Sequence, residues 1–325
     1  MSVYAIGEAL IDFVPNRAGS LLSGDIAFIP AVGGAPLNVA AAIAKLGGKS
    51  AILSQVGLDD FGEMIIQTVK NCGVDCNYLL QTKEAKTALA FVSLREDGER
   101  SFSFYRNPSA DMLYSAKNLE SINPSSNDIL HFCSVSLSAP IMKEAHEKAI
   151  EKFRANGGGI SFDINIRLPL WNSVEECVKA VQDFIPKADL IKISDDELPL
   201  VSGKKDIEEG IKTLFVGNVK QVIYTKGAKG AMIFNKSGLL CDVNSYKVVA
   251  VDATGAGDAF TGATLYQLQK QNIALNSDWS AELSQNILAF STAVGALTTL
   301  KRGAINALPS LEEVNTLIAK GTCNC

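Results

Sequence analysis

The sequence predicts an α/β fold, with a mostly parallel central sheet, helices on both of its faces and a small β lid. Short apolar runs alternate with helix-length stretches over most of the chain, which is typical of βαβ units. Two neighbouring runs within 88–105 instead resemble a hairpin. Polar clusters follow several expected strands, at the end where open α/β sheets bind ligands.

The individual elements follow from these runs and from the residues that interrupt them. Glycine and proline mark most boundaries, and the turn signal at 96–99 joins the two hairpin strands. Expected strands are 3–6, 27–29, 51–56, 88–94, 101–105, 129–133, 160–162, 190–193, 221–224, 231–234 and 247–251. Expected helices are 37–46, 61–72, 140–155, 174–181, 196–201, 207–215, 257–269, 281–297 and 311–318.

Length and composition favour a folded chain without a membrane span. Of 325 residues, 47% are hydrophobic and 20% are charged, which is enough apolar material for a large core. No repeat, linker or membrane-length apolar run interrupts the pattern. We therefore expect 1–325 to be a single α/β domain, with a lid formed by insertions at roughly 12–32 and 86–110.

Charge and cysteine usage restrict the partners and the compartment. The net charge of −5 argues against nucleic acid as the main partner. The seven cysteines are scattered and no signal-like segment opens the chain, so we expect reduced thiols in the cytoplasm. A monomer and a homodimer both remain open.

The most informative stretch is 252–262, a glycine-rich turn that precedes an expected helix. Free N–H groups at a helix N-terminus favour an anion. Asp258 would repel that anion, so its presence suggests a general base that accepts a proton from an attacking hydroxyl. An N-cap aspartate on an ordinary turn is the alternative, although it leaves the second aspartate, Asp252, unexplained.

A second glycine pair, Gly33 and Gly34, opens another expected helix and is followed by Asn38. Asn38 offers both a donor and an acceptor, as a sugar hydroxyl requires, but a surface asparagine at a helix entry is the alternative. Residues 47–50 resemble the end of a P-loop, yet they lack its first glycine and end a helix instead of opening one.

Taken together, the two glycine-rich stretches resemble the two signatures of the ribokinase-like, or PfkB, carbohydrate kinases. The first match is 33–38 and the second, more specific one is 252–263. The resemblance covers the whole chain and, within the family, is greatest to the fructokinases. Supporting stretches are 7–12, 104–111, 162–167 and 301–309.

The resemblance implies roles for residues on the sugar side and at the point of transfer. Asp258 is the implied base, and the N–H groups of Gly255, Ala256 and Gly257 form the implied anion hole. The implied sugar-binding residues are Asp12, Gly33, Gly34, Asn38, Phe104, Arg106 and Arg167. Each arginine has the alternative of an ordinary surface ion pair.

The resemblance also implies a nucleotide side and two kinds of cation. Glu197 is implied to hold Mg²⁺ through water, with Ser194 standing where many members have asparagine. Implied ATP-binding residues are Asn165, Lys192, Glu197, Thr225, Gly227, Gly230 and Asn286. A potassium ion beside the anion hole is implied at Asp252, Thr254, Thr298, Lys301 and Gly303.

The expected function is ATP-dependent transfer of a phosphoryl group to the 6-hydroxyl of fructose. Aminoimidazole riboside and 2-keto-3-deoxygluconate are alternative acceptors, the latter because Arg106 and Arg167 would suit a carboxylate. A sugar-binding regulator without activity is the alternative from another class, but it would not need Asp258. A nicotinamide dehydrogenase is disfavoured because no dinucleotide fingerprint follows the first strand.

Overall fold

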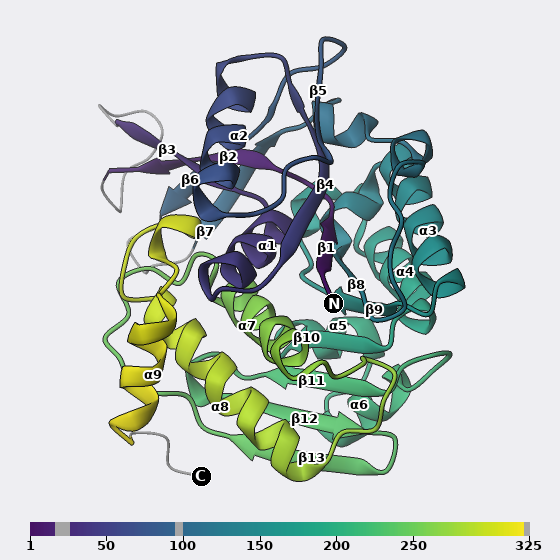
Figure 1. Cartoon of the computed structure of the whole chain (residues 1–325), viewed down its shortest axis with the longest axis vertical. Helices are drawn as coiled ribbons and strands as arrows, with labels where there is room; N and C mark the ends of the chain where they lie inside the picture. Colours follow the sequence, from purple (N-terminus) through teal and green to yellow (C-terminus); the bar gives the residue numbers. More distant parts are fainter. Residues whose placement is uncertain (17–26, 95–99, 322–325) are drawn as a thin grey trace.

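The computed structural model describes residues 1–16, 27–94 and 100–321. Its main feature is a nine-stranded sheet, parallel from β11 to β5, with β12 and β13 antiparallel at one edge (Figure 1). In spatial order the strands are β13 (Gly238–Val243), β12 (Ala231–Asn235), β11 (Gln221–Thr225), β10 (Leu190–Ser194), β9 (Gly159–Asp163), β8 (Ile129–Cys133), β1 (Val3–Ile6), β4 (Ser50–Gly57) and β5 (Leu79–Thr82).

Helices cover both faces of this sheet, as the alternation of runs predicted. One layer contains α1 (Ala35–Lys45), α2 (Asp60–Cys72), α7 (Ala256–Gln271) and α8 (Ala281–Thr298), with α9 (Leu311–Ala319) against α8. The other contains α3 (Pro140–Ala155), α4 (Val174–Phe184), α5 (Glu197–Ser202) and α6 (Ile207–Leu214). Short 3-10 helices are η1 (Ala110–Leu113), η2 (Ala116–Leu119), η3 (Ser134–Ser138), η4 (Leu168–Leu170), η5 (Ile185–Lys187), η6 (Gly227–Lys229) and η7 (Ile305–Ala307).

The period-two pattern of the strands divides the core between the two layers. In β1, Val3 and Ala5 belong to the core beneath α1 and α7, whereas Tyr4 and Ile6 belong to the core beneath α3 and α4. Successive side chains of a strand point to opposite faces. Central strands such as β8 and β9 are entirely buried, and their polar side chains His131 and Ser161 lie 3.1 Å apart as hydrogen-bond partners.

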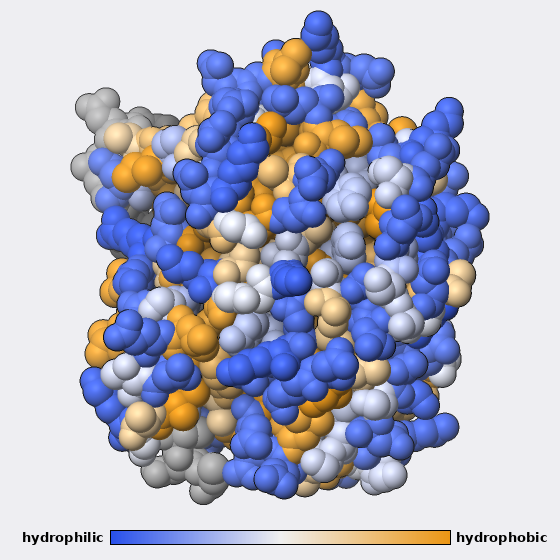
Figure 2. Space-filling view, in the orientation of Figure 1, coloured by the Kyte–Doolittle hydropathy of each residue, from blue (hydrophilic) through white to orange (hydrophobic). Residues whose placement is uncertain are grey.

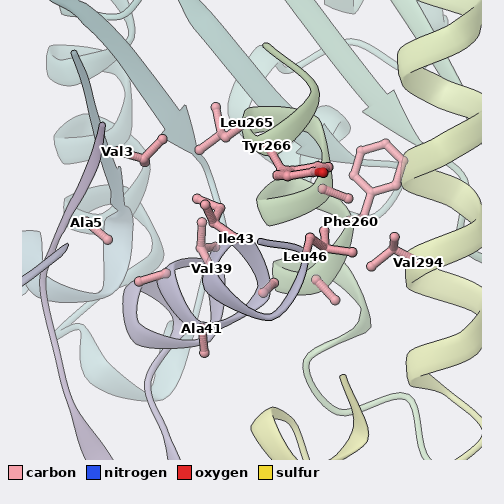
Figure 3. Packing of buried hydrophobic residues seen from close by; sticks show 14 of the residues in the cluster. Val3, Ala5, Val39, Ala41, Ile43, Leu46, Phe260, Leu265, Tyr266 and Val294 are labelled. Carbon is pink, nitrogen blue, oxygen red and sulfur yellow. The ribbon is translucent and has the colours of Figure 1, made fainter. Parts of the chain in front are cut away.

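The helices α1 and α7 cross in close contact at Gly262. A Cβ at Gly262 would lie 2.6 Å from the Cβ of Ala42, so only glycine permits this approach. Figure 3 shows Ile43 of α1 and Leu46, directly after this helix, near Tyr266 and Phe260 of α7. This packing fixes the N-terminal ends of the two helices next to each other.

A separate four-stranded sheet, here called the small sheet, has the order β3 (Phe28–Gly33), β2 (Leu10–Pro15), β6 (Ala88–Leu94) and β7 (Arg100–Tyr105). β6 and β7 pair antiparallel, as the hairpin signal predicted. One face carries Phe104 against Leu10 and Ala90. The opposite face carries Phe13 stacked on Phe91, with ring centroids 4.8 Å apart.

Several predicted elements differ from the structure. The strand predicted at 247–251 is wrong: Val249 and Val251 are 86% and 59% exposed, and the N–H groups of Val251 and Asp252 donate to the carbonyl of Thr299 instead of to a strand. β13 takes the edge of the sheet in its place. β2 and β5 were not predicted, and the turn predicted at 96–99 lies outside the described residues.

The surface agrees with a chain that does not enter a membrane through a helix. Within residues 1–16, 27–94 and 100–321, no helix combines the length and apolar character that a membrane crossing requires. Figure 2 shows hydrophilic side chains over much of one face, with apolar ones gathered in smaller areas between them.

Candidate active site

Chemically active side chains follow the C-terminal ends of the central parallel strands. Glu8 follows β1, Asn165 follows β9 and Lys192 lies near the end of β10. The N-termini of α1 and α7 meet the same edge of the sheet. Because parallel strands all end at this edge, residues far apart in the sequence are brought together.

A first cavity of about 520 Å³ lies between this edge and the small sheet. The small sheet contributes Leu10 and Asp12 from β2 and Phe102 and Phe104 from β7. Other predicted site residues that line it are Gly34, Asn38, Asn165, Arg167, Lys192, Glu197, Thr254, Gly255, Gly257 and Asp258. This cavity therefore unites most of the predicted sugar side with the glycine-rich turn.

A second cavity of about 630 Å³ lies on the other side of the turn, next to β11 and α8. It is more apolar than the first, with Tyr246, Val248 and Phe260 among its lining residues. Predicted nucleotide-side residues that line it are Lys192, Thr225, Gly227 and Gly230. An apolar pocket with a few polar groups suits the base of a nucleotide.

The two cavities meet at a shared set of four lining residues. These are Lys192, Ser194, Ala253 and Gly257. Two ligands that occupy the two cavities would therefore approach each other across the start of α7. Such an arrangement brings two reactants together in a fixed orientation.

The turn before α7 depends on Gly255 and on Asp252. Gly255 has φ of 74°, and a Cβ there would lie 2.6 Å from the Cβ of Ala304. Asp252 accepts hydrogen bonds from the N–H and hydroxyl of Thr254, both at 2.7 Å, and from the N–H of Gly303 at 3.0 Å. At the start of α7 the N–H of Ala256 donates to the carbonyl of Ala253 at 3.3 Å, and Gly257 lines both cavities. N–H groups in the first turn of a helix lack partners within the helix and are available to an anion.

Asp258 stands in the first turn of α7 and lines the first cavity. Its carboxylate accepts a 2.8 Å hydrogen bond from the Nδ2 of Asn38. Burial raises the pKa of Asp258, and Asn38, Arg167 and Lys192 oppose that shift. The carboxylate is thus a stronger base than an exposed aspartate.

Lys192 is held among carboxylates at the junction of the cavities. Its Nζ lies 3.1 Å from Oδ1 of Asp163, whose other oxygen accepts a 3.0 Å hydrogen bond from Thr261. Burial opposes the charge on Lys192, but Asp163, Glu197 and Asp258 together raise its pKa. The pKa of Asp163 is raised to about 6 by burial. The attraction between Lys192 and Asp163 favours the charged form of each group against the effect of burial.

Glu197 suits an indirect metal contact. Its two oxygens accept the N–H groups of Ile166 at 2.7 Å and Ser194 at 2.9 Å. Each oxygen retains a lone pair for a water molecule, and Mg²⁺ commonly keeps several waters. No cluster of three or more potential His, Cys, Asp or Glu ligands exists in the described part of the chain. A metal here would depend on water and on the ligand's own oxygens.

Some predicted residues do not line either cavity. Arg106 is buried and forms an ion pair with Asp111. Asn286 is exposed on α8, where Thr292, Gly295 and Ala296 face the second cavity instead. The others outside the linings are Gly33, which lies against the carboxylate of Asp12, and Asp252, Thr298, Lys301 and Gly303 behind the turn.

Other lining residues were not singled out from the sequence. Glu8 and Leu10 belong to the stretch 7–12 and Phe102 alternates with Phe104, so these two signals were available. Asp163 lines neither cavity but pairs with Lys192, and it belongs to the stretch 162–167. The loop residues Ser245, Lys247 and Ala250 of the second cavity carried no signal, because an expected strand was placed there.

The fold and its two joined cavities define an α/β enzyme that acts on two small ligands. Comparison with known proteins agrees with this class. The family model of the pfkB family carbohydrate kinases matches residues 1–311. The chain therefore belongs to the pfkB family of carbohydrate kinases, with the fold predicted from the sequence.

Curated and solved relatives match over nearly the whole length. Fructokinase-2 of Solanum lycopersicum is 43% identical over 98% of this chain and 96% of its own. Fructokinase of Vibrio cholerae, solved with fructose, ADP and a calcium ion, is 34% identical with a TM-score of 0.87 over 98% and 99% of the chains. Aminoimidazole riboside kinase of Salmonella enterica is 28% identical with a TM-score of 0.84 over 98% and 100%.

Proposed function

We propose that this protein is an ATP-dependent fructokinase that converts fructose to fructose 6-phosphate. One observation carries the proposal: Asp258 lines the first cavity in the first turn of α7, directly after Gly257, which lines both cavities. The identity of 43% to a fructokinase over almost the whole chain supports fructose as the acceptor.

In the proposed reaction, fructose occupies the first cavity and ATP the second. Asp258 accepts the proton of the 6-hydroxyl as its oxygen attacks the γ-phosphorus. The new O–P bond forms as the bond to the β-phosphate oxygen breaks, and ADP leaves. The N–H groups of Gly255, Ala256 and Gly257 stabilise the charge of the transferring phosphoryl group.

The sugar-binding role extends to the lining of the first cavity. Asp12, Asn38 and Arg167 provide the acceptors and donors that sugar hydroxyls need. Phe102 and Phe104 cover the cavity from the small sheet, which supports a lid function for that sheet. Within this proposal, closure of the lid excludes water that would otherwise compete with the sugar hydroxyl.

The nucleotide and its cations complete the proposal. Lys192 neutralises phosphate charge at the junction, and Thr225, Gly227 and Gly230 line the space for the nucleoside. Mg²⁺, held by Glu197 through water, would supply charge neutralisation at the phosphates when bound. The hydrogen bonds of Asp252 support a monovalent cation behind the turn. The unpaired cysteines of the described chain support a cytoplasmic location.

A substrate panel tests this function. ADP release would be measured with ATP, Mg²⁺ and each acceptor in turn: fructose, ribose, glucose, aminoimidazole riboside and 2-keto-3-deoxygluconate. We expect the largest kcat/KM with fructose. A larger kcat/KM with another acceptor would overturn the choice of sugar and keep the kinase, whereas ADP release without any acceptor dependence would overturn the kinase itself.

A further inference from the structure

Arg106 is held away from the sugar by a buried partner. It is 8% exposed, whereas Asp111 in η1 is not exposed at all, and the two form an ion pair. Asp111 also accepts a hydrogen bond from the hydroxyl of Ser109. η1 is fixed in turn, since the carbonyl of Ala110 accepts a 3.0 Å hydrogen bond from Gln55. Arg106 therefore has a rigid, charged neighbour that holds its guanidinium.

Glu8 lines the first cavity and interacts electrostatically with both members of this ion pair. Its carboxylate is 2% exposed and lines the cavity, whereas neither Arg106 nor Asp111 belongs to the lining. Glu8 accepts hydrogen bonds from the N–H of Ala35 at 3.0 Å and from the hydroxyl of Ser136 at 2.7 Å. Burial raises the pKa of Glu8, and the Arg106 guanidinium opposes that shift. The cavity wall therefore presents a carboxylate with its counter-charge buried behind it.

The charge that remains at the cavity surface is negative. Its acidic lining residues are Glu8, Asp12, Glu197 and Asp258, and its basic ones are Arg167 and Lys192. Lys192 is already paired with Asp163. Among the described lining residues, only Arg167 is then left to meet an anionic substituent on the sugar, against several carboxylates. An additional negative charge in this space is repelled.

We propose that Asp111 is a specificity-determining residue: it sequesters Arg106 and so restricts the first cavity to uncharged sugars, excluding sugar acids. Asp111 does not touch the substrate in this account and acts through Arg106 and Glu8. The inference rests on the proposed function, because it concerns the acceptor of that same reaction. The ion pair with Asp111 explains why Arg106 would not bind the carboxylate of a sugar acid, although the sequence places two arginines on the sugar side.

The test compares two acceptors that differ in one group. 2-Keto-D-gluconate is fructose in which the C1 hydroxymethyl group is a carboxylate, and both carry the same 6-hydroxyl. We expect wild-type protein to favour fructose strongly in kcat/KM. In Asp111→Asn, which keeps the shape but removes the charge, the unmasked Arg106 should reduce this preference by at least about tenfold. The double variant Arg106→Gln/Asp111→Asn should return the preference to within about threefold of wild type.

Each result has a defined meaning. A folded Asp111→Asn protein with unchanged preference would overturn the inference, as would a double variant that loses as much preference as the single one. If Asp111→Asn does not fold, Glu8→Gln replaces it: this change removes a carboxylate from the wall and should also lower the preference, and no change would overturn the inference. Wild-type protein that fails to use fructose would instead overturn the proposed function, so the two failures are distinguishable.

Discussion

The Nδ2 atom of Asn38 donates a 2.8 Å hydrogen bond to the carboxylate of Asp258, across 220 residues of sequence. This contact joins the two glycine-rich segments that the sequence singled out. It exists because Gly262 lets α1 and α7 approach closely, so that their N-termini share one edge of the sheet. The helix that carries the proposed base thus also positions the sugar side.

Loss of the Asn38 amide should change the pH dependence of the reaction. Its hydrogen bond lowers the pKa of Asp258 against the effect of burial. Asn38→Ala should therefore raise that pKa, and since the base acts only when deprotonated, the acid limb of kcat should move to higher pH. The position of the limb is the measurement, and exposed Asn123→Ala is the control. An acid limb that stays in place would contradict the role of this hydrogen bond.

Gly255 should be needed for turnover as well as for stability. Gly255→Ala forces an L side chain into a left-handed conformation and against Ala304, at about 1–2 kcal/mol for the backbone alone. Gly73→Ala is a matched control, with φ of 80° and no neighbour within 4 Å. We expect both variants to lose thermal stability and only Gly255→Ala to lose most of kcat. Equal retention of kcat would contradict the role of the turn.

Asp59 should stabilise the junction of α2 with the small sheet in a pH-dependent way. Burial opposes its charge, yet hydrogen bonds from Thr87 and from the N–H of Gly62 lower the pKa of Asp59 overall. A lowered folded-state pKa stabilises above the unfolded value of about 3.9 and ceases to do so as pH falls through the folded value.

The corresponding measurement is the free energy of unfolding of Asp59→Ala. We expect a loss of about 1–2 kcal/mol at pH 7, as for other N-cap residues, and a smaller loss near pH 3. The neighbouring exposed Asp60→Ala serves as control, because it makes none of these bonds. A loss that is equal at both pH values would show that the charge of Asp59 is not its source.

A monovalent cation should increase turnover if the segment behind the turn binds one. Behind the turn, the carboxylate of Asp252 accepts hydrogen bonds from Thr254 and from the N–H of Gly303, and these bonds fix the turn. We expect kcat to rise when potassium chloride replaces tetramethylammonium chloride at equal ionic strength, and Asp252→Asn to weaken this response. Identical kcat in the two salts would contradict a cation at this position.

Most of the fold was predictable from local patterns. β1, β6, β8 and α3 have the predicted bounds, because buried runs and a proline at the start of α3 define them without help from the rest of the chain. The strand predicted at 247–251 is wrong because this segment is apolar and strand-like but has no neighbouring strand with which to pair. β2 was missed for the opposite reason: its pairing with β3 and β6 outweighs a weak local signal.

Site residues that belong to a recognisable motif could be predicted from the sequence. Asp258 and Asn38 were named from two glycine-rich stretches, and the structure brings them into contact. The ion pair of Arg106 could not be predicted from the sequence. An arginine that follows a strand has the same local pattern whether its side chain contacts a substrate or a buried aspartate. Only the tertiary fold shows that η1 places Asp111 beside it.

The central claim is that Asp258 removes the proton from the attacking sugar hydroxyl. The most direct measurement is kcat and KM of Asp258→Asn, which retains the shape and the contact with Asn38 but removes the base. We expect kcat to fall by about 10²–10⁴, the usual contribution of a general base, with KM for fructose within a few fold of wild type. A variant that keeps most of its kcat would contradict the account.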